Sequence, residues 1–243
     1  MNSVFLSMAL CLSMLYGTAY ADPGLPWENA RQMIVVTTAD WQATSGRLQL
    51  YQRDSAGVSW SVVGDPIKVV VGAKGMGWGK GLQKEEMAQL PLKREGDLRA
   101  PAGVFSMSSG FGYASRSESR LPYIQATADI VCVDDKNSAF YNQIVHRSAE
   151  SVDWNSAEKM LRKDGLYALG VVVDNNPQRI PDAGSCVFLH VWRSKNQPTA
   201  GCTAMSLPEM KWVQAQLDPA RHPVLVQLPE AEYRMRRIAW QLP

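Results

Sequence analysis

Residues 186–205 read CVFLHVWRSKNQPTAGCTAM. In 186–192, larger side chains that include His190 alternate with valine and leucine, and side chains at alternate positions of a β-strand point to opposite faces. Residues 194–199 are polar and contain a proline, a composition typical of a turn. We therefore expect the chain to reverse after one strand and to carry Cys202 back beside it, as in a mainly β fold.

Similar short runs rich in β-branched and aromatic residues recur along the chain, separated by Gly, Pro, Asp and Asn. Many short strands at modest spacing indicate a barrel or sandwich, so the expected fold class is mainly β, barrel-like or sandwich-like, with a few short helices. The expected strands are 33–38, 47–53, 58–63, 67–71, 103–107, 167–173, 187–192 and 224–228.

Two helices are expected. Residues 207–217 follow Ser206-x-x-Glu209, a capping box, and Pro208 lies in the first turn, where proline is tolerated. A weaker candidate is 157–162. Internal repeats and a long linker are both missing from the sequence, so residues 22–243 are expected to form one domain.

Composition and charge exclude several classes of protein. The 243 residues are 46% hydrophobic and 20% charged, which is enough for a substantial core. A formal net charge of +2 does not favour a nucleic-acid-binding protein. Neither C-x-x-C nor H-E-x-x-H occurs, so we expect no metal and no cofactor.

Residues 1–21 are predicted to be a cleaved secretion signal. The mostly apolar residues 4–16 precede Ala19-Tyr20-Ala21, a small-x-small pattern typical of a cleavage site, although no Lys or Arg precedes them. Thirteen residues are too few to cross a bilayer, and no later apolar run approaches about 20 residues. The protein is therefore expected outside the cytoplasm, without a membrane span.

Cleavage of the signal would remove Cys11 and leave three cysteines in the secreted chain. Cys132, Cys186 and Cys202 are an odd number in an oxidising compartment, so at least one thiol stays free or pairs between chains. Cys186 would lie about 13 Å along the strand from His190, which is too far for a thiol–imidazole hydrogen bond. Cys202 can instead approach His190 through the chain reversal and act as a nucleophile. A satisfied core histidine and a tight Gly-Cys turn are the alternatives that spacing alone leaves open.

The motif Thr199-Ala-Gly-Cys-Thr-Ala-Met205, with His190 upstream, resembles the signature of the YkuD-type L,D-transpeptidases. The resemblance covers roughly residues 48–228. Further stretches that fit a branch of that family are LKREGD at 92–97, PAGVF at 101–105, FGY at 111–113, CVDD at 132–135, YN at 141–142 and GSCVFLH at 184–190.

The resemblance implies a barrel-like catalytic domain that exchanges peptide bonds in peptidoglycan. By this resemblance Cys202 is the nucleophile, His190 the general base and acid, and Gly201 part of the oxyanion region, with Thr199 and Thr203 beside the substrate. The expected partners are peptidoglycan stem peptides or free D-amino acids, in the periplasm or cell wall. Water as acceptor would make the protein an L,D-carboxypeptidase, and a non-catalytic wall-binding domain or a general cysteine protease are further alternatives.

Two positions depart from the family pattern. The histidine before Gly-Cys is Ala200 here, and the arginine that commonly follows two residues after the cysteine is Ala204. Donor carboxylate recognition therefore cannot be carried over from the family. Arg193 is our hypothesis for a compensating cation, because its guanidinium matches a carboxylate in a bidentate manner.

A disulfide between Cys132 and Cys186 would leave Cys202 as the odd thiol. The bridge would span 54 residues and contribute about 4 kcal/mol in the chain-entropy model. A link between Cys186 and Cys202 would instead undermine both the bridge and the nucleophile.

Overall fold

A computed structural model describes residues 24–83, 91–117, 119–148 and 151–243. The predicted secretion signal, residues 1–21, lies outside the described residues. Within the described part of the chain, no helix is long and apolar enough to span a membrane.

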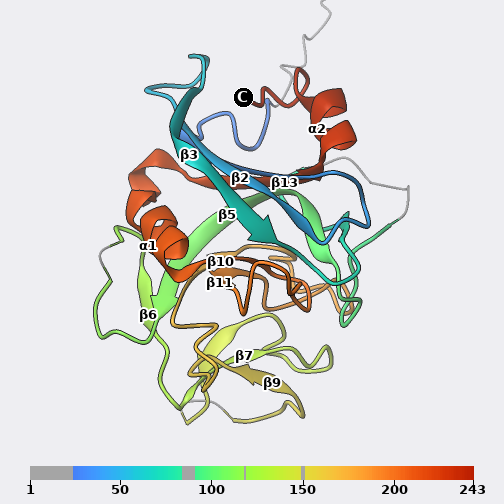
Figure 1. The fold of residues 1–243 in the computed structure, drawn as a ribbon. Coiled ribbons are helices and arrows are strands. Elements are labelled where there is room, and N and C mark those ends of the chain that lie inside the picture. Colours follow the sequence, from blue (N-terminus) through green and yellow to red (C-terminus); the bar gives the residue numbers. More distant parts are fainter. Residues whose placement is uncertain (1–23, 84–90, 118, 149–150) are drawn as a thin grey trace, which may run out of the picture.

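The described residues form a mainly β structure, as the sequence predicts (Figure 1). Eight strands follow one another around a ring, and pairing between the first and the last closes it. In ring order they are β10 (Leu169–Val173), β11 (Phe188–Val191), β12 (Thr203–Met205), β3 (Ser61–Val70), β2 (Ser45–Gln52), β1 (Gln32–Thr38), β13 (Val224–Pro229) and β5 (Ala100–Gly112).

Strand β5 has 13 residues, which is long enough to pair with a different strand along each half and so to close the ring. Its first half pairs with β13, where Gly103 lies opposite Gln227, and its second half pairs with β10, where Gly112 lies opposite Leu169. Two strands outside the ring, β4 (Met76–Trp78) and β6 (Tyr123–Gln125), also pair with β5.

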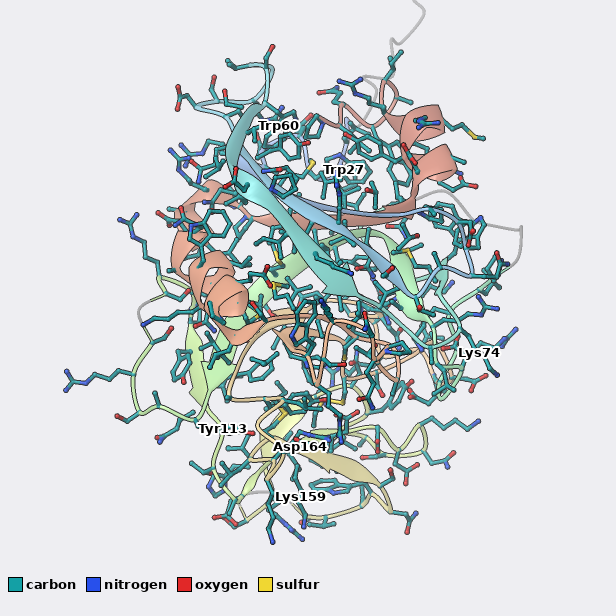
Figure 2. The ribbon with its side chains drawn as sticks, in the orientation of Figure 1. Trp27, Trp60, Lys74, Tyr113, Lys159 and Asp164 are labelled. Atoms are coloured by element: carbon teal, nitrogen blue, oxygen red, sulfur yellow. A yellow bond between two sulfur atoms is a disulfide. The ribbon has the colours of Figure 1, made fainter. Side chains whose placement is uncertain are left out.

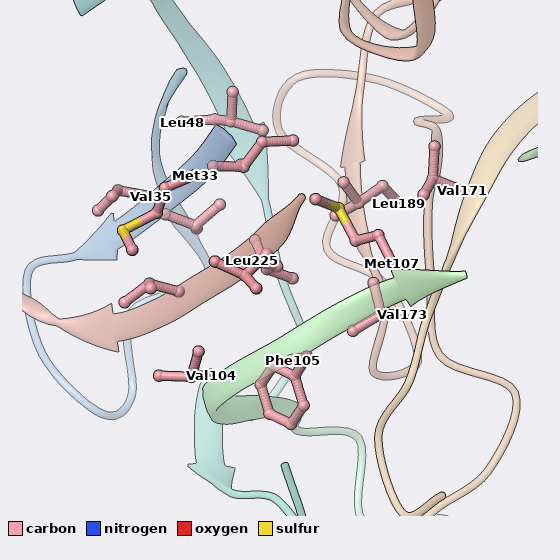
Figure 3. Close-up of a cluster of buried hydrophobic side chains, with 14 of the residues drawn as sticks. Met33, Val35, Leu48, Val104, Phe105, Met107, Val171, Val173, Leu189 and Leu225 are labelled. Carbon is pink, nitrogen blue, oxygen red and sulfur yellow. The ribbon is translucent and has the colours of Figure 1, made fainter. Parts of the chain in front are cut away.

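The core fills the barrel (Figure 3). Almost every residue of β1 and β13 is buried. Burial of each large side chain stabilises the fold by roughly 1.5–3 kcal/mol. Among the core side chains are Met33, Leu48, Val104, Phe105, Met107, Val171, Leu189 and Leu225.

Helix α1 (Leu207–Gln216) confirms the predicted capping box. The backbone N–H of Glu209 donates to Ser206 Oγ at 3.4 Å, and the N–H of Ser206 donates to the Glu209 carboxylate at 3.0 Å. The helix packs against β10 and β11, and it buries Met210 and Val213. The helix thereby supports these two neighbouring strands of the barrel.

Helix α2 (Glu230–Arg236) is not predicted from the sequence. Glu230 and Glu232 form ion pairs with Arg234 and Arg236 one turn later, which supports a helix in an otherwise polar segment. The helix packs on β13 and β1. A short 3-10 helix, η1 (Pro219–Arg221), precedes β13.

Three short strands form a second sheet in the order β8 (Ile144–His146), β7 (Ile130–Val133) and β9 (Ala157–Lys159). The predicted helix at 157–162 is wrong, because residues 157–159 pair with β7. A disulfide between Cys132 and Cys186 joins this small sheet to the chain just before β11. This is the pairing that leaves Cys202 free, and Cys202 is a free thiol here.

Two predicted strand boundaries also need correction. The strands expected at 58–63 and 67–71 are one strand, β3, because the intervening Gly-Asp-Pro forms an irregularity opposite Gln49 and not a turn. The amide of Gln49 donates to the carbonyls of Val63 and Gly64 and fills the gap in the ladder. Strand β11 begins only at Phe188, because Cys186 adopts φ +51, outside the extended region.

Candidate active site

A cavity of about 400 Å³ lies between the barrel and the small sheet. Its walls come from segments far apart in the sequence. They are formed by residues within 93–98, by Asp134, and by residues within 158–167, 185–193 and 197–202. Both Cys202 and His190 line it, together with Gly201, Thr199 and Arg193. The chain reversal predicted after His190 therefore brings five of the six predicted site residues to one cavity.

Parallel pairing of β11 with β12 places the side chains of Cys202 and His190 on one face of the sheet. Leu189 is opposite Thr203, and His190 is opposite Ala204. Cys202, one residue before β12, is thus level with Phe188, two residues before His190. Because side chains two residues apart share a face of the sheet, Cys202 and His190 project on the same side.

The sulfur of Cys202 has two backbone contacts. The N–H of Phe188 donates to Sγ at 3.4 Å, and the thiol donates to the carbonyl of Cys186 at 3.6 Å. Burial raises the pKa of the Cys202 thiol to about 12, and the charge of Glu158 acts in the same direction. The Phe188 N–H and the charge of Lys93 oppose this rise by favouring the thiolate. At neutral pH the thiol is therefore protonated.

His190 is buried, with 5% of its surface exposed. Its Nδ1 lies 2.8 Å from the carbonyl of Val191. Because a carbonyl only accepts, Nδ1 carries the proton of the neutral ring, and Nε2 is the nitrogen that can take a further proton. Burial lowers the pKa of His190 to about 4, although the Val191 carbonyl favours the charged ring. The site thus holds a neutral thiol and a neutral imidazole.

An aromatic cluster fixes the imidazole. The ring of Tyr167 packs edge-on against His190 with centroids 5.3 Å apart, and against Phe188 with centroids 5.4 Å apart. The tyrosine hydroxyl donates to the carboxylate of Glu158 on β9. The barrel and the small sheet therefore meet around the histidine.

Thr199 and Gly201 shape the loop that carries the cysteine. The Thr199 hydroxyl donates to the carbonyl of Cys202 at 2.6 Å and accepts from the N–H of Gly201 at 3.1 Å. The amide of Gly201 is therefore engaged within the loop, and the expected oxyanion region around Gly201 stays a prediction. Gly201 has φ +152, and a Cβ there would lie 3.0 Å from the carbonyl of Arg99. Glycine is thus needed at this position to bring the loop close to residue 99.

The prediction for Thr203 is wrong. Thr203 is buried and does not line the cavity, and its hydroxyl donates to Gln227 on β13 at 2.6 Å. The reason is strand alternation, since Thr203 points to the opposite side of the chain from Cys202. Its role is to join β12 to the barrel interior.

Arg193 reaches the cavity together with Arg162. The carboxylate of Asp164, labelled in Figure 2, accepts from the guanidinium of Arg162 at 2.9 and 2.6 Å and from that of Arg193 at 3.1 Å. These bonds, those from Arg162 first, hold the pKa of Asp164 at about 2. One carboxylate thus anchors two cations at the rim.

Sequence reasoning missed most of the cavity residues, among them Lys93, Glu158 and Tyr167. Lys93 belongs to the 92–97 stretch that resembles the transpeptidase family, so a pointer to it exists in the sequence. Its buried ammonium pairs with Asp97 at 2.6 Å. Glu158 and Tyr167 have no such pointer, because they reach the cavity through the pairing of β9 and through ring packing.

The described residues contain no group of three or more His, Cys, Asp or Glu side chains arranged to hold a metal ion. Comparison of the chain with protein-family models, with curated proteins and with solved structures found no match.

Proposed function

We propose that this protein is a cysteine-dependent acyl transferase of the L,D-transpeptidase class, acting on the stem peptides of peptidoglycan. The observation that carries the proposal is the free thiol of Cys202 in one cavity with the neutral imidazole of His190. The resemblance of residues 199–205 to the transpeptidase signature supports the choice of substrate.

The neutral state of both groups defines the first step. His190 Nε2 takes the thiol proton as the sulfur of Cys202 attacks the donor carbonyl, so that thiolate forms only during the reaction. The Phe188 N–H, 3.4 Å from the sulfur, stabilises the developing charge. When the tetrahedral intermediate collapses, the C–N bond breaks and the imidazolium gives its proton to the leaving amine.

The second step releases the acyl group. An amine attacks the thioester carbonyl, a C–N bond forms, the C–S bond breaks and Cys202 regains its proton through His190. The amine comes from a second stem peptide, another protein or a free D-amino acid. Water in its place would give carboxypeptidase activity.

Arg193 and Arg162 are the proposed cations for the donor carboxylate. Their shared partner Asp164 orients both guanidinium groups at the cavity. Such an arrangement compensates for Ala204, where an arginine is common in the transpeptidase family.

The proposed location is the periplasm or cell wall. The apolar start of the sequence supports export, and a disulfide between Cys132 and Cys186 suits an oxidising compartment.

Incubation with muropeptides and a D-amino acid, followed by mass analysis, tests the proposal. The expected result is a covalent adduct on Cys202 together with an exchange product, both missing from the Cys202→Ala variant. Loss of the terminal residue without exchange would indicate a carboxypeptidase. Binding without an adduct would indicate a wall-binding domain, and cleavage of ordinary L,L-peptides would indicate a general protease.

A further inference from the structure

Glu158 is a titratable cavity residue that the mechanism above does not use. It lies on β9 directly opposite Cys132, and the disulfide to Cys186 holds this part of the small sheet over the cavity. The backbone carbonyl of that same Cys186 contacts the thiol of Cys202. Strand pairing and the disulfide therefore fix the position of the Glu158 carboxylate relative to the thiol of Cys202.

Among the described residues, Glu158 has a hydrogen-bond donor but no ion-pair partner. Its Oε2 accepts from the hydroxyl of Tyr167, which is a neutral donor. Arg162, the cation whose charge acts on Glu158, is bound to Asp164 instead. Burial raises the pKa of Glu158, which makes its carboxylate a stronger base than an exposed one.

For the thiol this charge is unfavourable, because it raises the pKa of Cys202. A carboxylate next to a cysteine nucleophile therefore does not assist the first step. It suits the second step, in which the incoming acceptor is an ammonium ion that must lose a proton before its nitrogen can attack.

We propose that Glu158 binds the ammonium group of the acceptor and removes its proton, and so directs the thioester toward an amine and away from water. This inference rests on the proposed transferase function. The carboxylate takes one proton from the ammonium. The free amine then attacks the thioester carbonyl, the C–N bond forms and the C–S bond breaks. The second amine proton passes through His190 to the sulfur, and Glu158 releases its own to solvent.

The variant that isolates the charge is Glu158→Gln, because a carboxamide oxygen still accepts from the Tyr167 hydroxyl. With a stem tetrapeptide as donor and D-phenylalanine as acceptor, we expect the ratio of exchange to hydrolysis to fall about a hundredfold, the low end of the usual effect of a general base. Adduct formation without acceptor should not slow. Hydroxylamine, an uncharged amine at neutral pH, should react with the thioester of the variant nearly as fast as with that of the wild type.

Two controls separate this role from a structural one. Asp174→Asn removes another partly buried carboxylate, which accepts from Ser106 and Ser108 at 2.7 Å outside the cavity, and should leave the ratio unchanged. Tyr167→Phe removes the hydrogen bond to Glu158 but keeps the charge, and should retain most of the exchange. A readout apart from turnover is the pH midpoint for alkylation of Cys202, which should fall in Glu158→Gln because a negative charge is lost.

Three results would overturn the proposal. One is an unchanged ratio of exchange to hydrolysis in Glu158→Gln. Another is an equal loss in Tyr167→Phe, which would show that Glu158 only positions the tyrosine. A third is a wild-type protein that forms no adduct at all, which refutes the transferase function itself and is distinguished from the other two by the missing first step.

Discussion

The protonated thiol of Cys202 can be tested through the pH dependence of its alkylation by iodoacetamide. Burial raises its pKa from an ordinary 9.0 to about 12. Because each pH unit changes the thiolate fraction about tenfold, roughly one molecule in 10⁵ carries the thiolate at pH 7, compared with roughly one in 10² for an unperturbed thiol. We expect alkylation at pH 7 to be about 1000-fold slower than that of N-acetylcysteine, and to rise without a plateau up to about pH 11.

Mass spectrometry of the peptide that contains Cys202 provides the rates. Steric shielding would lower the rate equally at every pH, so the midpoint is the decisive value. The His190→Ala variant should react as slowly as the wild type at pH 7, because the imidazole holds no thiol proton at rest. A plateau between pH 5 and 8 that His190→Ala abolishes would refute the reasoning, since it would indicate a preformed thiolate–imidazolium pair.

Three further predictions follow from the contacts above. Reduction of the Cys132–Cys186 disulfide should lower the free energy of unfolding by about 4 kcal/mol, measured by urea titration, and an unchanged midpoint would contradict the chain-entropy argument. Burial lowers the pKa of His190 from 6.5 to about 4, so between these two pH values the unfolded chain binds a proton at this histidine and the folded chain does not. The free energy of unfolding of the wild type should therefore decrease by about 3 kcal/mol as the pH falls from 6.5 to 4. His190→Gln should lack this component, and identical pH profiles of the two proteins would count against it. Arg193→Ala should raise the KM for the donor about tenfold with little change in kcat, whereas unchanged turnover and unchanged donor affinity would remove Arg193 from the site.

The main barrel strands are predictable because burial on a sheet leaves a pattern several residues long. Runs 33–38 and 224–228 fall within β1 and β13, where most residues are apolar and almost all are buried. Strands β12 and β9 have only three residues each, too few for a period to be recognised. They form because neighbouring strands offer hydrogen-bonding partners, and this information is not local to the sequence.

The site residues also divide into those that a local pattern predicts and those that only the folded chain brings together. Cys202 and His190 are predictable because one polar turn separates them, and strand geometry limits where the chain can go next. Glu158 lines the same cavity from a distant segment, so only the closed barrel and the attached small sheet reveal it. The position of Thr203 is not predictable from the motif, because one-letter code does not show which face of a strand each residue takes.

The covalent link between the small sheet and the barrel has a consequence for how the chain matures. Cys186 is 54 residues from Cys132 but only 16 from Cys202. In an unfolded chain, closing the shorter loop costs about 1 kcal/mol less, so random oxidation favours the bond that would consume the reactive thiol. Docking of β7 beside Cys186 before oxidation would reverse this preference, so the yield of free Cys202 thiol depends on the order in which the chain folds and oxidises.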